Sequence, residues 1–108
     1  MDSVIKKNID IIQQICIRFH VKKLYAFGSV VSSSFNERSD IDFLVTFDLV
    51  TLEEYSDNFF GLMNSLQELL KRTVDLVITT TLQNPYFIES VDESKILIYD
   101  KEHQEVFI

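Results

Sequence analysis

The chain contains very little glycine, proline and cysteine. Two glycines and one proline in 108 residues leave little room for flexible linkers or low-complexity segments, and we find no internal repeat. The lone cysteine, Cys16, excludes an internal disulfide framework, and its place in an apolar helical pattern predicts a buried side chain in a reducing compartment. We therefore expect a single domain that covers residues 1–108.

Basic residues and long apolar runs are also scarce. Ten Lys and Arg residues against 17 Asp and Glu residues give a net charge of −7, which repels a nucleic-acid backbone. We expect no direct nucleic-acid partner and, if a nucleotide is bound, a small one or one that arrives with Mg²⁺. No run of about 18 apolar residues occurs, and the N-terminus lacks a signal-peptide core. A cytoplasmic protein without a membrane partner is expected.

What the chain does contain is enough apolar sequence for a core, since 46% of its residues are hydrophobic and 12% are aromatic. Apolar spacings of three and four and capping signals predict three helices: from Ser3, with Ser3 or Asp2 as cap, to about His20, from a capping box at Thr51 to near Lys71, and from Asn84-Pro85 to about Val91. Short apolar or alternating runs predict four strands: Leu24–Phe27, Ile41–Phe47, Val74–Ile78 and Ile96–Tyr99. Between Ser29 and Ser39 we expect a helical turn followed by a loop. These elements predict an α/β or α+β domain with a sheet of three or four strands, whose pairing order stays open.

Three aspartates lie on or beside the predicted strands. Asp40 and Asp42 project to one face of their strand, about 6–7 Å apart, an arrangement that costs energy unless a cation lies between them. Mg²⁺ is the natural candidate, because it prefers oxygen ligands and is usually held by a few carboxylates together with phosphates. Asp75, a carboxylate among β-branched apolar residues, is placed to join one of two metal ions and to accept a proton from an attacking hydroxyl.

A possible phosphate turn precedes these carboxylates. Gly28 permits close approach of the backbone to a ligand, and Ser29 adds a hydroxyl at a predicted helix start, where free N–H groups favour phosphate. Each feature alone also has a structural interpretation, because Asp-x-Asp is common on solvated strand edges and Gly-Ser is a common turn. The ordered combination is more informative than its parts.

The segment GSVVSSSFNERSDID, followed later by Val74-Asp75-Leu76-Val77, resembles the signature of the DNA polymerase β-type nucleotidyltransferase superfamily. That signature is Gly-Ser, a spacer, Asp-x-Asp and a later Asp on another strand. The spacer of ten residues, the small size and the ending LQNPYFIESVDESKILIYD are similar to the minimal nucleotidyltransferase branch. The resemblance extends from the first strand to Tyr99 and implies a nucleotidyltransferase-like fold with a small mixed sheet flanked by helices.

The resemblance implies transfer of a nucleoside monophosphate, AMP from ATP in the first instance, to an acceptor hydroxyl. By position, it implies that two Mg²⁺ ions are bound by Asp40, Asp42 and Asp75, that Asp75 is also the base, and that the nucleotide is held by Gly28, Ser29 and Ser39. Members of this branch are commonly encoded beside a small helical HEPN protein and act as its antitoxin. Some of them do so by adenylylating a tyrosine of that toxin.

One departure from the family pattern affects the phosphate turn. Family members often continue Gly-Ser with a small residue, Arg and Gly, whereas Val31-Ser32-Ser33 stands here, so a cation that could pair with triphosphate is missing. Replacements are available in Lys22, Lys23, Arg38 or a basic residue of a partner.

Two other functions stay open. The chain could neutralise a HEPN partner by occlusion with weak or no catalysis, or modify a small molecule, which is less favoured because such enzymes usually carry a second domain. Apolar surface left exposed could also serve a homo-oligomer.

Overall fold

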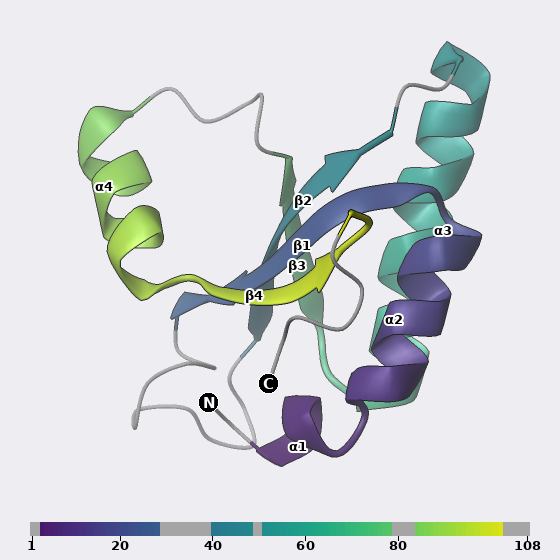
Figure 1. Cartoon of the computed structure of the whole chain (residues 1–108), viewed down its shortest axis with the longest axis horizontal. Helices are drawn as coiled ribbons and strands as arrows, with labels where there is room; N and C mark the ends of the chain where they lie inside the picture. Colours follow the sequence, from purple (N-terminus) through teal and green to yellow (C-terminus); the bar gives the residue numbers. More distant parts are fainter. Residues whose placement is uncertain (1–2, 29–39, 49–50, 79–83, 103–108) are drawn as a thin grey trace.

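The computed structural model describes residues 3–28, 40–48, 51–78 and 84–102. It shows a four-stranded sheet with helices on both faces (Figure 1). The elements in chain order are α1 (Ser3–Lys6), α2 (Ile9–Arg18), β1 (Val21–Phe27), β2 (Ile41–Phe47), α3 (Leu52–Leu70), β3 (Val74–Ile78), α4 (Pro85–Ser94) and β4 (Ile96–Asp100). The predicted fold class, a small mixed sheet flanked by helices, is confirmed.

The strand order in the sheet is β3-β2-β1-β4. β1 pairs antiparallel with both β2 and β4, whereas β2 pairs parallel with β3. The parallel pair requires a crossover, and α3 provides it, as is usual for such connections. As a result, the C-terminal end of β1 and the N-terminal ends of β2, β3 and β4 meet at the same end of the sheet.

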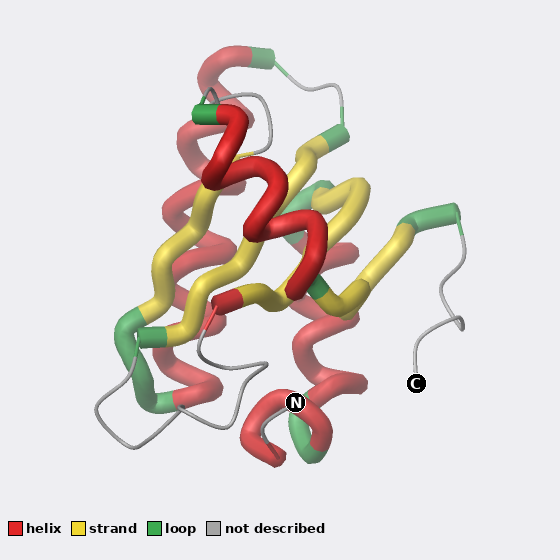
Figure 2. Tube along the Cα trace, turned by 90° about the vertical axis from the view of Figure 1, so that its left-hand side faces the viewer, coloured by secondary structure: helices red, strands yellow, loops and turns green. Residues whose placement is uncertain are grey.

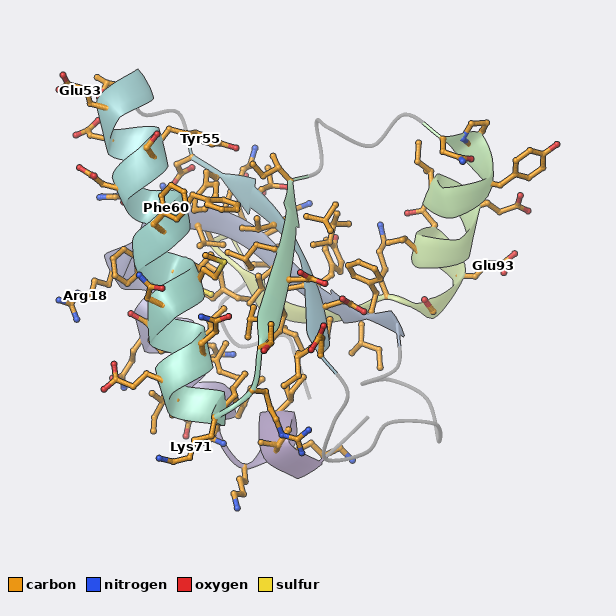
Figure 3. All side chains as sticks on the ribbon, turned by 180° about the vertical axis from the view of Figure 1, so that it is seen from behind. Arg18, Glu53, Tyr55, Phe60, Lys71 and Glu93 are labelled. Atoms are coloured by element: carbon orange, nitrogen blue, oxygen red, sulfur yellow. The ribbon has the colours of Figure 1, made fainter. Side chains whose placement is uncertain are left out.

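Both faces of the sheet are covered, but unequally. The larger core lies beneath α1, α2 and α3 and includes the odd-numbered β2 residues Ile41, Phe43 and Val45. The opposite face, which we call the α4 face, has a smaller apolar cluster of Phe27, Leu44 and Val91 with Tyr25 and Val77 packed against it. Figure 2 shows α4 in front of the strands and the other helices behind them. The labelled side chains in Figure 3 agree, since Tyr55 and Phe60 lie on α3 and Glu93 lies across the sheet on α4.

The first helix differs from its prediction. A single helix from Ser3 to about His20 is wrong, because the chain forms two helices that are separated at Lys7 and Asn8. The Asn8 side chain donates a hydrogen bond from Nδ2 to the Val4 carbonyl oxygen at 2.8 Å. Asparagine side chains compete with helical hydrogen bonds in this way, which explains the break. Asp2 and the predicted turn over residues 29–39 lie outside the described residues.

The other predicted elements are confirmed with small changes in their ends. The capping box at Thr51 is present, since Thr51 Oγ1 accepts from the Glu54 N–H and Thr51 N–H donates to Glu54 Oε2. α4 continues three residues beyond Val91, and β1 begins three residues before Leu24. Cys16 is buried as predicted. Within the described residues no helix is long and apolar enough to cross a membrane.

Candidate active site

Gly28, Asp42 and Asp75 meet at one end of the sheet. Phe27 of β1 pairs with Asp42 of β2, and Asp42 pairs with Asp75 of β3. Both aspartates alternate with residues of the larger core, so their side chains share the α4 face. The register therefore brings Gly28, which follows Phe27, next to Asp42 at this end of the sheet.

Gly28 lies directly against the Asp42 carboxylate. Gly28 has φ +75°, a conformation that L-residues rarely adopt, and a Cβ atom built on it would lie 2.5 Å from Asp42 Oδ2. A side chain at position 28 would therefore collide with the carboxylate as well as strain the backbone. Glycine at this position therefore keeps the backbone and the carboxylate in contact.

The electrostatics of this end are unfavourable for an ionised Asp42. The pKa of Asp42 is raised from its ordinary value of 3.8 to about 6, mainly because the half-buried carboxylate loses solvation. The negative charges of Asp75 and Asp40 and a side-chain hydrogen bond with Asp75 raise it further. Carboxylates that crowd together in this way favour either a shared proton or a bound cation.

The other predicted site residues have different surroundings. Asp40 is exposed and immediately precedes β2. The apolar neighbours of Asp75 suggested a buried carboxylate, but Asp75 is exposed on β3, an edge strand of the sheet. Ser29 and Ser39, the two predicted nucleotide-binding serines, lie outside the described residues.

The donor set at this end suits Mg²⁺. Carboxylate oxygens are the ligands that Mg²⁺ prefers, and the charge crowding on Asp42 is relieved by a cation. Among the described residues no three His, Cys, Asp or Glu side chains form a group that could hold a metal ion. Mg²⁺ usually takes only one or two protein carboxylates and completes its shell with water and substrate phosphates, so a site of this kind fits the ion when a nucleotide is present.

Lys22 and Lys23, two of the cations suggested as replacements for the missing arginine, lie far from the aspartates. Lys23 pairs with Thr46 on one side and Asp100 on the other, near the far end of β1. It lies five residues from Gly28, or about 16 Å along an extended strand. Lys22 is farther still, and Arg38 lies outside the described residues. Lys22 and Lys23 therefore do not reach this end of the sheet.

Sequence reasoning missed Lys95, which follows α4. Its ammonium lies 4.6 Å from the centroid of the Tyr25 ring on the α4 face. It also pairs with Asp92, one helical turn earlier, at 2.9 Å. No local motif marks this lysine, because only the antiparallel pairing of β4 with β1 brings it towards the aspartates.

Comparison with known families and proteins finds a matching family and several relatives. Residues 6–104 match the family described as "Polymerase beta, Nucleotidyltransferase". A candidate protein adenylyltransferase of Methanocaldococcus jannaschii is 35% identical over 96 residues, which cover 89% of this chain and 92% of that protein. A second such protein of the same organism is 32% identical over 81 residues, covering 75% and 80% of the two chains.

Solved structures share the fold. A structure described as a candidate minimal nucleotidyltransferase superposes with a TM-score of 0.68 at 30% identity, covering 89% of this chain and 95% of the other. A chain from a toxin-antitoxin complex with AMP-PNP gives a TM-score of 0.65 at 20% identity, covering 89% and 76%. A chain from a complex of a tri-AMPylated Shewanella oneidensis HEPN toxin with its MNT antitoxin gives 0.59 at 19% identity, covering 91% and 74%. The last two likenesses support the fold alone.

Proposed function

This chain belongs to the polymerase beta nucleotidyltransferase family, and on that premise we propose that it transfers AMP from ATP to a hydroxyl group of a protein. The relatives named as protein adenylyltransferases favour a protein acceptor. The observation that carries the proposal is the contact of Gly28 with the Asp42 carboxylate, in register with Asp75.

The reaction needs one bond to form and one to break. The acceptor oxygen attacks the α-phosphorus of ATP, its proton passes to Asp75, and the bond between the α-phosphorus and the bridging oxygen breaks. The electron pair of that bond leaves with pyrophosphate. Asp75 suits the role of base because it is exposed on an edge strand, where an acceptor from another protein can reach it. Catalysis of this kind depends mainly on positioning and charge neutralisation.

Two Mg²⁺ ions complete the proposed site. Asp40 and Asp42 would hold both ions and Asp75 one of them, while Gly28, Ser29 and Ser39 would hold the nucleotide. When bound, the ions would neutralise negative charge on the phosphates and would lower the basicity of the attacking and leaving oxygens. Asp42 then serves the site as an anion, because a cation offsets the loss of solvation and the repulsion that raise its pKa.

The proposed acceptor is a tyrosine of a HEPN-type toxin, with this chain as the antitoxin. Support comes from the solved complexes in which chains of this fold accompany HEPN toxins, one of them AMPylated. Large apolar side chains are also exposed on the helices of this chain and offer contact area to another protein: Ile11, Ile17, Phe60 and Tyr86.

The test is to incubate the purified protein with ATP labelled on the α-phosphate, Mg²⁺ and the product of the adjacent gene, which the proposal expects to be the HEPN-type partner. We expect label on the partner, located on a tyrosine by mass spectrometry, and no label when EDTA is added or when Asp42→Asn replaces the wild type. The matched control is Asp48→Asn, which removes a carboxylate from the other end of β2. Absence of label with a folded, ATP-binding protein and a toxic partner would contradict the proposal.

Occlusion of the partner without catalysis is the second candidate, favoured by Val31-Ser32-Ser33 in place of the arginine-containing turn. The double variant Asp40→Asn/Asp42→Asn separates the two functions. If it still binds and neutralises the toxin, occlusion is sufficient. If it binds the toxin but no longer neutralises it, transfer is the function.

A further inference from the structure

The row of paired residues that contains the aspartates continues across the sheet to Lys95. Asp75, Asp42 and Phe27 pair in turn across β3, β2 and β1. On the far side of β1, Ala26 pairs with Ile96, the first residue of β4. Because that pair is antiparallel, the residue next to Phe27 across the sheet is Lys95.

Lys95 is separated from the aspartates by a short and defined span. Neighbouring strands lie about 4.8 Å apart, which places the Lys95 backbone about 10 Å from that of Asp42 and about 14 Å from that of Asp75. The Lys95 N–H donates to the Val91 carbonyl oxygen at 2.8 Å, so the end of α4 fixes the start of its side chain. A triphosphate with its α-phosphate at Asp42 and an extended lysine side chain together bridge the backbone separation between Asp42 and Lys95.

The ammonium lies on the same face as the carboxylates. Its position over the Tyr25 ring, 4.6 Å from the centroid, puts it on the α4 face, where Tyr25 packs beside Leu44 and Phe27. Asp42 projects from that same face. The positive charge and the acidic residues therefore flank one stretch of sheet surface.

The geometry of the reaction indicates on which side of the aspartates the acceptor and the leaving pyrophosphate lie. In nucleotidyl transfer the attacking and leaving oxygens lie roughly in line across the phosphorus. If Asp75 on the β3 edge receives the acceptor proton, the acceptor approaches from β3 and pyrophosphate departs towards β1 and β4. Gly28 and Lys95 lie on the side of β1 and β4, opposite to the side from which the acceptor approaches.

A phosphate can replace Asp92 as the ion-pair partner of Lys95. Its ion pair with Asp92 leaves the Lys95 side chain 29% exposed and that of Asp92 56% exposed, and such pairs add little stability in water. Glu93 points away from the sheet in Figure 3 and does not compete for the ammonium. A phosphate carries more charge than Asp92 and accepts stronger hydrogen bonds from an ammonium.

We propose that Lys95 binds the β- and γ-phosphates of the nucleotide, and the pyrophosphate that leaves, in the role that the arginine of the usual turn would otherwise fill. The inference rests on the proposed function. It assigns the leaving-group side of the site to the junction of α4 and β4, a segment that is distant in sequence from the Gly-Ser turn.

The experiment measures binding by calorimetry, so that it needs no acceptor protein. The probes are Mg·ATP, Mg·pyrophosphate and AMP, and the variants are Lys95→Met and Lys95→Arg. We expect Lys95→Met to weaken Mg·ATP and Mg·pyrophosphate binding by about tenfold, the loss of one charge-assisted contact, and to change AMP binding by less than about twofold. Lys95→Arg keeps the charge and should restore most of the affinity.

Two controls separate phosphate binding from a structural role. Lys101→Met removes a lysine with a carboxylate partner, Asp48, from the other end of the sheet and should leave all three affinities unchanged. Asp92→Asn removes the ion pair but keeps Lys95. A structural role predicts that Asp92→Asn weakens nucleotide binding as Lys95→Met does, whereas phosphate binding predicts unchanged or tighter Mg·ATP binding.

Each outcome has a clear meaning. If the wild type binds Mg·ATP and folded Lys95→Met binds it equally well, the role of Lys95 is wrong and the proposed function stands. If the wild type binds no Mg·ATP at all, the proposed function fails and takes the role of Lys95 with it. If Lys95→Met does not fold, Asp92→Asn decides, because a loss of Mg·ATP affinity in that variant would refute phosphate binding by Lys95.

Discussion

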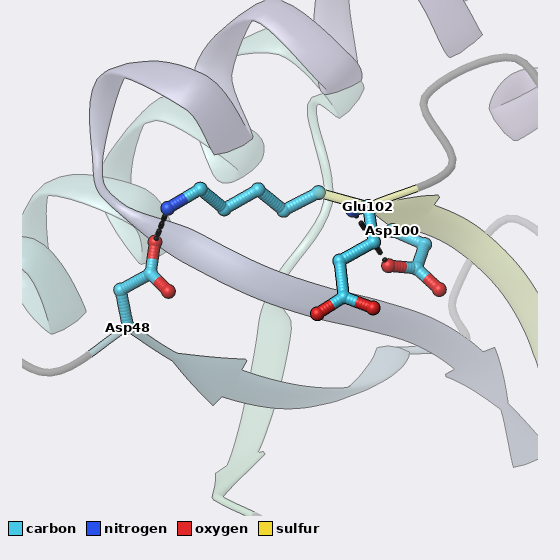
Figure 4. Close-up of polar contacts among 4 residues, drawn as sticks. Asp48, Asp100 and Glu102 are labelled. Carbon is cyan, nitrogen blue, oxygen red and sulfur yellow. Dashed lines mark hydrogen bonds and ion pairs between the residues drawn. The ribbon is translucent and has the colours of Figure 1, made fainter.

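The two ends of the sheet handle carboxylates in opposite ways. At the acidic end, formed by Gly28, Asp40, Asp42 and Asp75, the negative charges raise the pKa of Asp42, and no ion pair to these aspartates occurs within the described part of the chain. At the other end, which we call the paired end, Asp48 Oδ2 accepts from Lys101 Nζ at 2.7 Å and Asp100 Oδ1 accepts from the Glu102 N–H at 3.0 Å (Figure 4).

This contrast distinguishes carboxylates that stabilise the fold from carboxylates that are proposed to bind a ligand. At the paired end the carboxylates are satisfied by the chain itself, and the backbone is tied together by the Asp48 N–H to His20 oxygen and the Lys101 N–H to Lys22 oxygen bonds, both 2.9 Å. At the acidic end the charges oppose folding, and the proposed binding of a cation and phosphates would account for their presence there. Substitutions at the two ends should therefore have opposite effects on stability and unequal effects on activity.

The largest expected effect is the loss of AMP-transfer rate in the variant Asp42→Asn. The amide keeps the size of the carboxylate but removes a charge that would hold both metal ions, so the rate should fall about 10³-fold, the equivalent of several kcal/mol of transition-state stabilisation. Transfer of labelled AMP under single-turnover conditions measures it. Asp48→Asn at the paired end should retain the wild-type rate, and equal losses in the two variants would show that the ends do not differ in function.

A smaller effect is expected from Gly28→Ala. The added Cβ would lie against Asp42 Oδ2 on a backbone with φ +75°, and we expect a loss of about 2 kcal/mol in the free energy of unfolding. Because the collision displaces the Asp42 carboxylate, transfer should fall too. Gly61→Ala is a useful comparison, since its Cβ would meet the Phe19 ring far from the aspartates. If Gly61→Ala impairs folding but leaves the transfer rate of the folded fraction unchanged, the loss at Gly28 is local to the site.

The stability of Asp42→Asn should depend on pH. Between about pH 4 and pH 6 the folded protein holds a proton on Asp42 that the unfolded chain releases, so the wild-type free energy of unfolding falls as pH rises through this window. Above pH 6 the variant should be more stable by about 1–2 kcal/mol after allowance for solvent screening. Below pH 4 the gain should vanish.

Urea unfolding at pH 4 and pH 8 measures this difference. Mg²⁺ provides a second readout, because a cation at Asp42 should raise the Tm of the wild type at pH 8 and leave that of Asp42→Asn unchanged. A variant that is less stable than the wild type at pH 8 would contradict the charge crowding at the acidic end.

Sequence reasoning reached the aspartates because their pattern is local. Asp40-Ile41-Asp42 begins a strand of alternating residues, and Asp75 interrupts an apolar strand. The local pattern and the residue types therefore single out both motifs without knowledge of the fold. The exposure of Asp75 could not be predicted, since it depends on β3 being an edge strand. The helix break at Asn8 was missed because a single side-chain hydrogen bond to Val4 overrides a continuous apolar period.

The cations were harder to place than the carboxylates. Lys22 and Lys23 lie at the start of β1, the strand that leads to Gly28, and nearness in sequence suggested that they serve the phosphate turn. The extended strand instead places them at the opposite end of the sheet. Lys95 is far from Gly28 in sequence, and only the pairing of Ala26 with Ile96 brings it into the same row. Strand order is a long-range property that periodicity and motif spacing do not encode.

The smallest expected effect comes from Asp48→Asn at the paired end. The hydrogen bond with Asp48 is the main cause of the raised pKa of Lys101. The pair therefore stabilises the fold at neutral pH. This contribution is lost only as the pH rises above 10.5, the ordinary pKa of lysine. Lys101 is more than half exposed, which limits the contribution and makes it sensitive to salt. Asp48→Asn should therefore lower Tm slightly in dilute buffer and hardly at all in 1 M NaCl. Asp42→Asn should instead raise Tm in dilute buffer at pH 8. Calorimetric scans of the two variants at both salt concentrations compare the ends directly, and a shift of the same sign in both variants would remove the distinction between them.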